Sequence, residues 1–296
     1  MHEKVAVEIE RVIKNDIGCR GLGDAVIVDD LIKAAEELYG SSKILIVTGF
    51  CILEPLCGET DGPLGAVSLA GALEQLGKTV MLLTDSYSEK IVRACKRAKG
   101  IKAEVAVVPF HGANGFCRLL LDSFKPNHIV AVERPGKAKN GRFYSMRGND
   151  LTNVVPDTDI LFELAGELGI KTTAVGDGGN ELGMGKVKDI VVRSLKNGAT
   201  IVAEASADYA IVAGVSNWGA HGLEAMLSVL EGRLLLHDSS IEKSIIKAMI
   251  NAGAVDGCTG KGEPTVDGLS LEVNIDILKK LRKLVTENLF QEAAAD

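Results

Sequence analysis

Two kinds of apolar pattern alternate along the chain. Short, nearly continuous apolar runs are typical of strands buried on both faces, and they occur at residues 43–48, 79–84, 104–108, 128–132, 171–175, 200–203 and 209–213. Most stretches between them have apolar residues three and four positions apart, as in 66–76, 88–98 and 160–168, which predicts helices. Strands that alternate with helices predict an α/β fold with three layers, in which helices flank a mainly parallel sheet, with a mixed sheet as the alternative.

Helical spacing at 4–13 and 29–39 predicts two further helices before the first strand, with a turn at 20–24 between them. We expect a single domain over residues 1–296, with N-terminal helices in 1–40, a βα core in 41–235 and a helical and loop region in 236–296. Residues 134–157 interrupt the alternation. They could link two domains, but we favour a long loop over the site, because such a segment in a compact unit usually serves function.

Composition narrows the kind of protein. The net charge of −7, without a long basic run, argues against nucleic acid and anionic membrane surfaces as partners. Charges interrupt the N-terminal residues, so they lack the apolar stretch of a signal peptide, and no window approaches the ~20 apolar residues of a membrane span. The six cysteines contain no Cys-x-x-Cys pair, which disfavours a zinc site or a disulfide scaffold. We expect a cytoplasmic protein that binds a small anionic metabolite; a homo-oligomer is compatible with the sequence.

Polar segments follow six of the predicted strands, and five of these segments contain glycine. Because the carboxyl ends of parallel strands meet at one edge of a sheet, where ligands bind in open α/β folds, we expect these segments to gather there. Turn formation and helix capping are the alternative explanation for each segment taken alone. The segments are residues 48–50, 84–85, 109–112, 133–136, 176–181 and 214–219.

Two acidic, glycine-rich turns, at residues 58–65 and 176–185, are the strongest candidates for a shared site. Glycine lets a ligand approach the main chain closely. Proton transfer needs an acid and a base, and clustering raises the pKa of one carboxyl group toward neutrality. The candidate catalytic residues are Glu59, Asp61, Asp177 and Glu181. Alternatively, Asp61 and Asp177 cap helices that begin near Pro63 and Leu182.

Clustered carboxylates also require relief of their mutual repulsion, by protons, by cationic side chains or by a metal ion. Arg134, Arg147 and Lys186 could supply the positive charge. If a cation supplies it, oxygen ligands favour Mg²⁺, Mn²⁺ or Ca²⁺ over Zn²⁺, with Asp61 and Asp177 as the ligands.

Other side chains near the predicted strand ends are suited to binding a substrate. Arg134 and Arg147 could each pair with a substrate carboxylate by two parallel hydrogen bonds, although solvated surface arginines are the alternative. Ser216, Asn217 and Trp218 offer hydroxyl, amide and indole donors, and Trp218 could equally be a core residue. The remaining candidates are Thr48, Gly49, Glu133, Gly178, Gly179 and Asn180.

Several familiar motifs are missing from the sequence, among them Gly-x-x-x-x-Gly-Lys-[Ser/Thr], Gly-x-Ser-x-Gly and His-Glu-x-x-His. The pairs Gly21-x-Gly23 and Gly183-x-Gly185 are too short for a dinucleotide fingerprint. We therefore expect no nicotinamide, flavin or pyridoxal phosphate cofactor.

The combination of these segments resembles the D-glutamate cyclase family. The matching segments are Thr48-Gly49-Phe50, Glu59-Thr60-Asp61-Gly62-Pro63-x-Gly65-Ala66, Glu133-Arg134-Pro135-Gly136, Met146-Arg147-Gly148, Gly176-Asp177-Gly178-Gly179-Asn180-Glu181-x-Gly183-Met184-Gly185 and Ser216-Asn217-Trp218-Gly219, and Arg20-Gly21 extends the likeness toward the N-terminus. The resemblance implies a lyase that reversibly interconverts D-glutamate and 5-oxo-D-proline, with loss or gain of water.

Two other functions remain open. The same acidic turns could serve a metal-dependent hydrolase or lyase that acts on another small carboxylic acid or lactam. Alternatively, glycine-rich turns and strand-end N–H groups could bind an anionic metabolite without catalysis.

Overall fold

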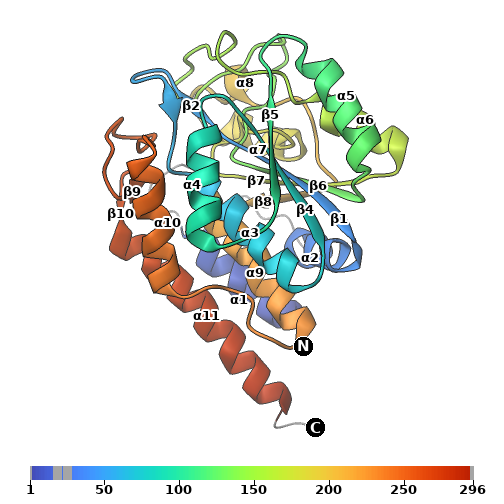
Figure 1. Ribbon diagram of the computed structural model, residues 1–296, viewed down its shortest axis with the longest axis vertical. Coiled ribbons are helices and arrows are strands. Elements are labelled where there is room, and N and C mark those ends of the chain that lie inside the picture. The colour runs from blue at the N-terminus through green and yellow to red at the C-terminus, as the bar shows by residue number, and fades with distance from the viewer. Residues whose placement is uncertain (1, 16–21, 23–28, 294–296) are drawn as a thin grey trace.

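A computed structural model describes residues 2–15, 22 and 29–293 of the chain. Within these residues a central sheet of six strands has the order β5–β4–β1–β6–β7–β8, and all five strand pairings are parallel (Figure 1). The prediction of an α/β fold with a mainly parallel sheet is confirmed. The strands are β1 (Lys43–Thr48), β4 (Thr79–Asp85), β5 (Glu104–Val108), β6 (His128–Val132), β7 (Lys171–Gly176) and β8 (Tyr209–Val212).

Helices cover both faces of the sheet and complete the three layers (Figure 1). The larger helical layer contains α1 (His2–Ile13), α2 (Asp30–Gly40), α3 (Pro63–Gln75), α4 (Glu89–Lys99), α9 (Ser216–Glu231), α10 (Ser239–Asn251) and α11 (Leu271–Ala293). The opposite layer contains α5 (Ala113–Phe124), α6 (Ile160–Leu168) and α7 (Lys188–Ser194).

The central strands supply side chains to two separate cores. In β1, Ile44 and Ile46 join the core beneath α3 and α9, whereas Leu45 and Val47 join the core beneath α5 and α6. Successive side chains of a strand point to opposite faces. Because both faces are covered, β1 reads as a continuous apolar run rather than an alternating one.

One predicted strand is wrong. Residues 200–203 belong in part to the short helix α8 (Gly198–Ile201), and only Ala203 forms an isolated bridge, with Ala138. Ile201 packs against Ala138 and Tyr144, outside the sheet. The apolar run at this position reflects a small satellite core rather than a strand. The predicted turn at 20–24 falls almost wholly outside the described residues, as do Arg20 and Gly21.

Two short antiparallel pairs lie outside the main sheet and were not predicted. One joins β2 (Cys51–Ile52) to β3 (Cys57–Gly58), and the other joins β9 (Thr265–Val266) to β10 (Leu269–Ser270). Along the sequence, the first pair comes between β1 and α3, and the second pair comes between α10 and α11.

The strand order locates the place where a ligand should bind. Counted along the chain, the six sheet strands have the order 3-2-1-4-5-6, which is that of doubly wound dinucleotide-binding folds. The direction of winding reverses between β1 and β6. In such sheets the crevice lies outside the carboxyl ends of these two strands.

Candidate active site

The first acidic turn lies against the carboxyl ends of β1 and β6. Gly62 has a φ of +92°, and a Cβ atom there would lie 2.7 Å from Glu133 Cβ and 2.9 Å from Thr48 Oγ1. Glycine alone combines this backbone conformation with such close contacts. The turn that carries Asp61 is therefore fixed at the point where the winding of the sheet reverses.

Asp61 and Asn217 cap each other's helices. The Asp61 carboxylate accepts hydrogen bonds from the backbone N–H groups of Ser216 and Asn217, each at 2.8 Å, at the N-terminus of α9. In return, Asn217 Oδ1 accepts from the N–H groups of Gly62 and Gly65, at 3.0 and 2.7 Å, at the N-terminus of α3. Asp61 is thus a cap, as the alternative interpretation held, but the helix that it caps is α9 rather than α3.

The second acidic turn folds back on itself around Glu181. Glu181 Oε1 accepts from the backbone N–H groups of Asp177 and Gly178, at 3.2 and 2.7 Å. Its other oxygen, Oε2, is buried without a hydrogen-bond partner among the described residues. Within the described chain the next helical turn is a short 3₁₀ helix that begins at Gly185, so Asp177 does not cap a helix near Leu182.

Four buried carboxylates converge on a fifth, that of Asp177. One oxygen from each of Asp61, Asp177 and Asp267 lies within 4.8 Å of the other two, and the same is true of Glu133, Asp177 and Glu181. All five side chains are nearly inaccessible to solvent. The two acidic turns therefore do form one cluster, which we call the Asp177 cluster.

The surroundings of Glu133 in the Asp177 cluster disfavour its ionisation. It follows β6 with a positive φ of 45°, and Ser216 Oγ donates a 2.5 Å hydrogen bond to its Oε2. Burial first, and then the neighbouring carboxylates Asp177, Glu181, Asp61 and Glu59, raise the pKa of Glu133 well above its ordinary value. Glu133 is accordingly suited to carry a proton in this cluster.

Asp267 is a member of the cluster that sequence reasoning missed. It occupies the turn between β9 and β10 with a φ of +53°. The pair Asp267-Gly268 between strand-forming residues is a hairpin signal that could have predicted the turn, but local sequence does not reveal that the turn reaches the sheet edge. Glu59 lies in the same region, since a Cβ atom at Gly257 would lie 1.9 Å from Glu59 Oε2.

A cavity of about 550 Å³ lies beside the cluster. Glu59, Glu133, Asp177 and Asp267 contribute to its acidic wall, and residues 145–151 of the long segment between β6 and α6 contribute another wall. The remaining lining comes mainly from residues 50–54 and 257–260. A ligand in this cavity would contact both the carboxylates and the long segment.

The two candidate arginines have different surroundings. Arg134 is fully buried, and its guanidinium forms an ion pair with Asp85 and donates to Gly49 O at 3.1 Å and to Pro156 O at 2.8 Å. Arg147 is exposed at the cavity wall and donates to Cys258 O at 2.8 Å. Arg147 is therefore the arginine placed to meet a ligand, whereas the contacts of Arg134 join the ends of neighbouring strands and loops.

Of the other predicted residues, some line the cavity and others are buried in the structure around it. Asn180 lines the cavity and donates from Nδ2 to Tyr144 O at 2.8 Å. Gly178 lies beneath Met146, whose sulfur would be 2.3 Å from an added Cβ atom. The hydroxyl of Thr48 is buried and has no hydrogen-bond partner within the described chain. Trp218 is a core residue that donates to Asn274 Oδ1 at 2.8 Å.

The donor set of the Asp177 cluster fits a hard divalent cation. Carboxylate oxygens are the ligands that Mg²⁺, Mn²⁺ and Ca²⁺ prefer, and two oxygens on opposite sides of a Ca²⁺ ion are about 4.8 Å apart. The oxygens of each three-residue group lie within that separation. The unpartnered Oε2 of Glu181 offers a further acceptor.

Fold and site together define a doubly wound α/β protein with an acidic site at the switch point of its sheet. The chain belongs to the D-glutamate cyclase-like family, as the resemblance predicted: the family model described as "D-glutamate cyclase-like, C-terminal" matches residues 9–282. The chain is also similar to the human protein named "D-glutamate cyclase, mitochondrial", with 37% identity over 253 residues, which cover 80% of this chain and 41% of that protein. It thus spans about two fifths of the length of this curated relative.

No helix within the described residues is both long and apolar enough to cross a membrane.

Proposed function

We propose that this chain is a lyase that reversibly interconverts D-glutamate and 5-oxo-D-proline. The observation that carries this proposal is the cluster of five buried carboxylates centred on Asp177 beside a cavity. Similarity to a protein named D-glutamate cyclase supports the choice of substrate.

The chemistry requires two protons to move from nitrogen to oxygen. In cyclisation the substrate ammonium loses two protons as the amine attacks the γ-carboxylate, the new C–N bond forms, and one γ-oxygen leaves as water. A carboxylate base is needed for the ammonium, and an acid is needed for the departing oxygen. Asp177 is our choice for the base, assisted by Glu59, Asp61 and Glu181. Protonated Glu133, whose pKa is raised by burial and by its neighbours, is our choice for the acid.

The substrate's own negative charges need partners. Arg147 at the cavity wall suits the α-carboxylate, and the Asn180 side-chain amide, which also lines the cavity, suits an oxyanion. We further propose a divalent cation of the Mg²⁺, Mn²⁺ or Ca²⁺ type on Asp61 and Asp177, with Asp267 as a third ligand. When bound, such an ion would neutralise the γ-carboxylate and make its carbon more electrophilic.

The test is incubation of the protein with D-glutamate, L-glutamate and each enantiomer of 5-oxoproline, followed by chiral chromatography. Each incubation is run after EDTA treatment and after return of each cation. We expect turnover of the D-enantiomers only. Asp177→Asn should lower kcat/KM at least about 100-fold while the protein remains folded, since proton-transfer catalysis contributes that much. Asp122→Asn, at an exposed position on α5, is the matched control.

Other outcomes would assign the site differently. Turnover of another small acid or lactam, lost in EDTA, would indicate a different metal-dependent hydrolase or lyase. Thermal stabilisation by these ligands without turnover would indicate a binding protein. Full activity after EDTA treatment, with no metal in elemental analysis, would leave catalysis to side chains and backbone N–H groups.

A further inference from the structure

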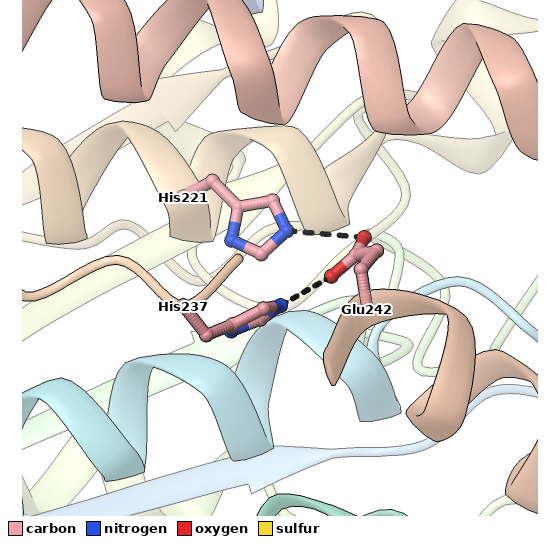
Figure 2. A group of neighbouring side chains, drawn as sticks. All are labelled: His221, His237 and Glu242. Atoms are coloured by element: carbon pink, nitrogen blue, oxygen red, sulfur yellow. Dashed lines mark hydrogen bonds and ion pairs between the residues drawn. The ribbon is translucent and has the colours of Figure 1, made fainter. Parts of the chain in front are cut away.

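A second buried polar group lies within the larger helical layer, away from the cavity. In Figure 2, the rings of His221 and His237 both point to the carboxylate of Glu242. Further contacts surround the two rings: Glu224 contacts His221, Lys99 contacts His237, and Ser68 contacts Glu224. We call these six residues the His221 network; all of them are buried or largely buried.

Hydrogen-bond geometry assigns the protons of His221. Ser68 Oγ lies 2.9 Å from Glu224 Oε2, and it donates because a carboxylate only accepts. His221 Nδ1 lies 3.0 Å from Glu224 Oε1, and His221 Nε2 lies 3.4 Å from Glu242 Oε1. Since both ring nitrogens face carboxylate oxygens, both carry hydrogen. His221 is therefore an imidazolium ion.

The same reasoning leaves His237 neutral. Its Nε2 lies 2.6 Å from Glu242 Oε2 and donates to it. Its Nδ1 lies 2.7 Å from Lys99 Nζ and 2.8 Å from Ser68 Oγ. Because the Ser68 hydroxyl gives its hydrogen to Glu224, Nδ1 accepts from the Lys99 ammonium group. The network then holds two cations, His221 and Lys99, and two anions, Glu224 and Glu242. Such a neutral and hydrogen-bonded group can be buried without a large penalty.

The ionisation of these groups agrees with this assignment. Burial opposes the charge on His221, but Glu242 and Glu224 outweigh it and raise the pKa of His221 to about 10. Burial likewise opposes the charge on Glu242, but His221 outweighs it and lowers the pKa of Glu242 to about 2. Burial lowers the pKa of His237.

A metal ion is the competing explanation, because His221, His237 and Glu242 could each offer one ligand atom within 4.8 Å of the others. Two distances favour protons instead. The 2.6 Å contact from His237 Nε2 to Glu242 is that of a hydrogen bond, shorter than the separation of two ligands on one ion, since each metal–ligand bond is itself about 2.0–2.2 Å. The Lys99 ammonium 2.7 Å from His237 would repel a cation bound there.

The network joins the two helices whose first residues build the candidate active site. Ser68 lies on α3 and His221 and Glu224 lie on α9, and each helix begins at the reciprocal caps formed by Asp61 and Asn217. The helices approach closely near those caps, where a Cβ atom at Gly65 would lie 2.9 Å from Asn217 Cα. A displacement of α9 along α3 would therefore break the caps and move Ser216 away from Glu133.

We propose that His221 is a positioning residue, an imidazolium ion that joins Glu224 of α9 to Glu242 of α10 and so fixes the Glu224 carboxylate that accepts from Ser68 of α3. Through this contact it holds α3 and α9 together at the candidate active site. The effect on catalysis rests on the proposed function, but the positioning itself does not. Both parts can be tested separately.

The first test is ¹⁵N NMR of histidine-labelled wild-type protein at pH 8. Protons on both nitrogens of His221 are expected. A neutral His221 ring would overturn the proposal, as would stoichiometric metal in elemental analysis that is lost in His221→Gln.

The second test is hydrogen exchange in the double variant His221→Gln/Glu242→Gln, which removes one cation and one anion and so keeps the network neutral. The amides of Ser216, Asn217 and Gly65 should exchange at least about tenfold faster, measured relative to amides of α5. His128→Gln, which removes a buried histidine at the opposite end of the sheet, is the control and should not accelerate these amides selectively.

Activity provides the third readout. If D-glutamate is turned over, the double variant should lose at least about tenfold in kcat with a smaller change in KM, because misplaced catalytic groups impair chemistry more than binding. Uniform acceleration of exchange throughout the protein would overturn the positioning role. Absence of turnover in the wild type would reject the proposed function and leave the exchange result to decide the role of His221.

Discussion

Glu133 combines a positive φ, a buried side chain and four acidic neighbours in a single residue. Its raised pKa means that the folded protein keeps a proton that the unfolded chain releases above about pH 4.3. As pH rises from that value toward the folded pKa, the folded state binds more protons than the unfolded state, so stability falls.

Glu133→Gln should therefore reduce the fall in the free energy of unfolding as the pH rises from about 4.3. The variant keeps the shape of the protonated acid, and its free energy of unfolding at pH 8 should equal or exceed that of the wild type. Its kcat should fall at least about 100-fold, because the amide has no acidic proton to deliver. Urea unfolding and turnover between pH 5 and 9 measure the two effects. A less stable variant with unchanged turnover would show that Glu133 acts only as a hydrogen-bond acceptor for Ser216.

Arg134 and Asp85 form an ion pair that is inaccessible to solvent. Arg134→Met should lower the free energy of unfolding by about 3–5 kcal/mol, since it leaves a buried charge without a partner. Adding Asp85→Asn removes that charge and should recover part of the loss. A double-mutant cycle from urea unfolding measures the coupling. If Arg134 instead binds substrate, Arg134→Met will raise KM with little change in stability.

Individual residues show where sequence reasoning stops. The acidic turns around Asp61 and Asp177 could be recognised because glycine and carboxylates are concentrated there. Asp267 could not, because an Asp-Gly turn is ordinary until its distance to the sheet edge is known. The partners of Arg134 were hidden for the same reason, since Asp85 lies 49 positions away in the chain.

At the scale of elements, the exchange of caps between α3 and α9 is stronger than a single N-cap. Asn217 Oδ1 satisfies two N–H groups of α3, and Asn217 Nδ2 donates to Thr60 O at 3.1 Å. Loss of a single cap typically costs about 1 kcal/mol. Gly62 N–H also donates to Asp61 Oδ1 at 2.9 Å, so removal of the Asn217 side chain leaves two buried groups, Gly65 N–H and Thr60 O, without this partner. Each such group costs about 1–3 kcal/mol.

Asn217→Ala should accordingly destabilise the protein by at least about 2 kcal/mol in urea unfolding. Asp238→Ala is the comparison, because Asp238 is the N-cap of α10, where it accepts from Ser240 and Ile241 N–H groups near the surface. That variant should cost about 1 kcal/mol. Equal losses in the two variants would mean that water replaces the contacts of Asn217.

Strands were predicted well where both of their faces are buried, and helices were predicted well where apolar residues recur with helical spacing. The runs at 43–48, 104–108 and 128–132 match β1, β5 and β6 at both ends, because apolar side chains are required on both faces of these strands. The run at 200–203 misled because four apolar residues also suit a satellite core. The hairpins β2–β3 and β9–β10 have too few residues to show any period.

At the scale of the whole molecule, ionisable groups buried in the sheet make stability depend on pH. His128 at the start of β6 is fully buried, and burial lowers its pKa to about 4. The unfolded chain takes up this proton near pH 6.5, so the contribution of His128 to stability is complete above pH 6.5 and is lost as pH falls toward 4. Asp159, with a pKa raised by burial to about 7, changes stability in the opposite direction over a similar range.

The contribution of His128 is therefore best measured as a difference between two proteins. His128→Gln retains a partner for Thr173, whose hydroxyl lies 2.7 Å from the His128 ring. Between pH 7 and pH 4 the stability of this variant relative to wild type should rise by about 3 kcal/mol. Urea unfolding across that range provides the measurement. A constant difference would contradict the prediction, because it would show that His128 takes up its proton at the same pH in the folded and unfolded protein.

The order of the strands is the part of the fold that no local pattern contains. Alternating strands and helices indicate a parallel sheet. They do not tell which two strands lie beside β1, because that depends on the path of the later crossover connections. The placement of the site followed from the sheet type alone, because carboxyl ends of parallel strands share an edge. Its exact position between β1 and β6 required the strand order.

The carboxylates that meet at Asp177 come from positions as far apart in the chain as residues 61 and 267. During synthesis on the ribosome, the first acidic turn emerges long before the hairpin that carries Asp267. Such long-range contacts close late in folding, so like charges are driven together only when most of the structure already exists. The last step of assembly must then capture a neutralising proton or ion. Completion of the fold and loading of the site become a single event.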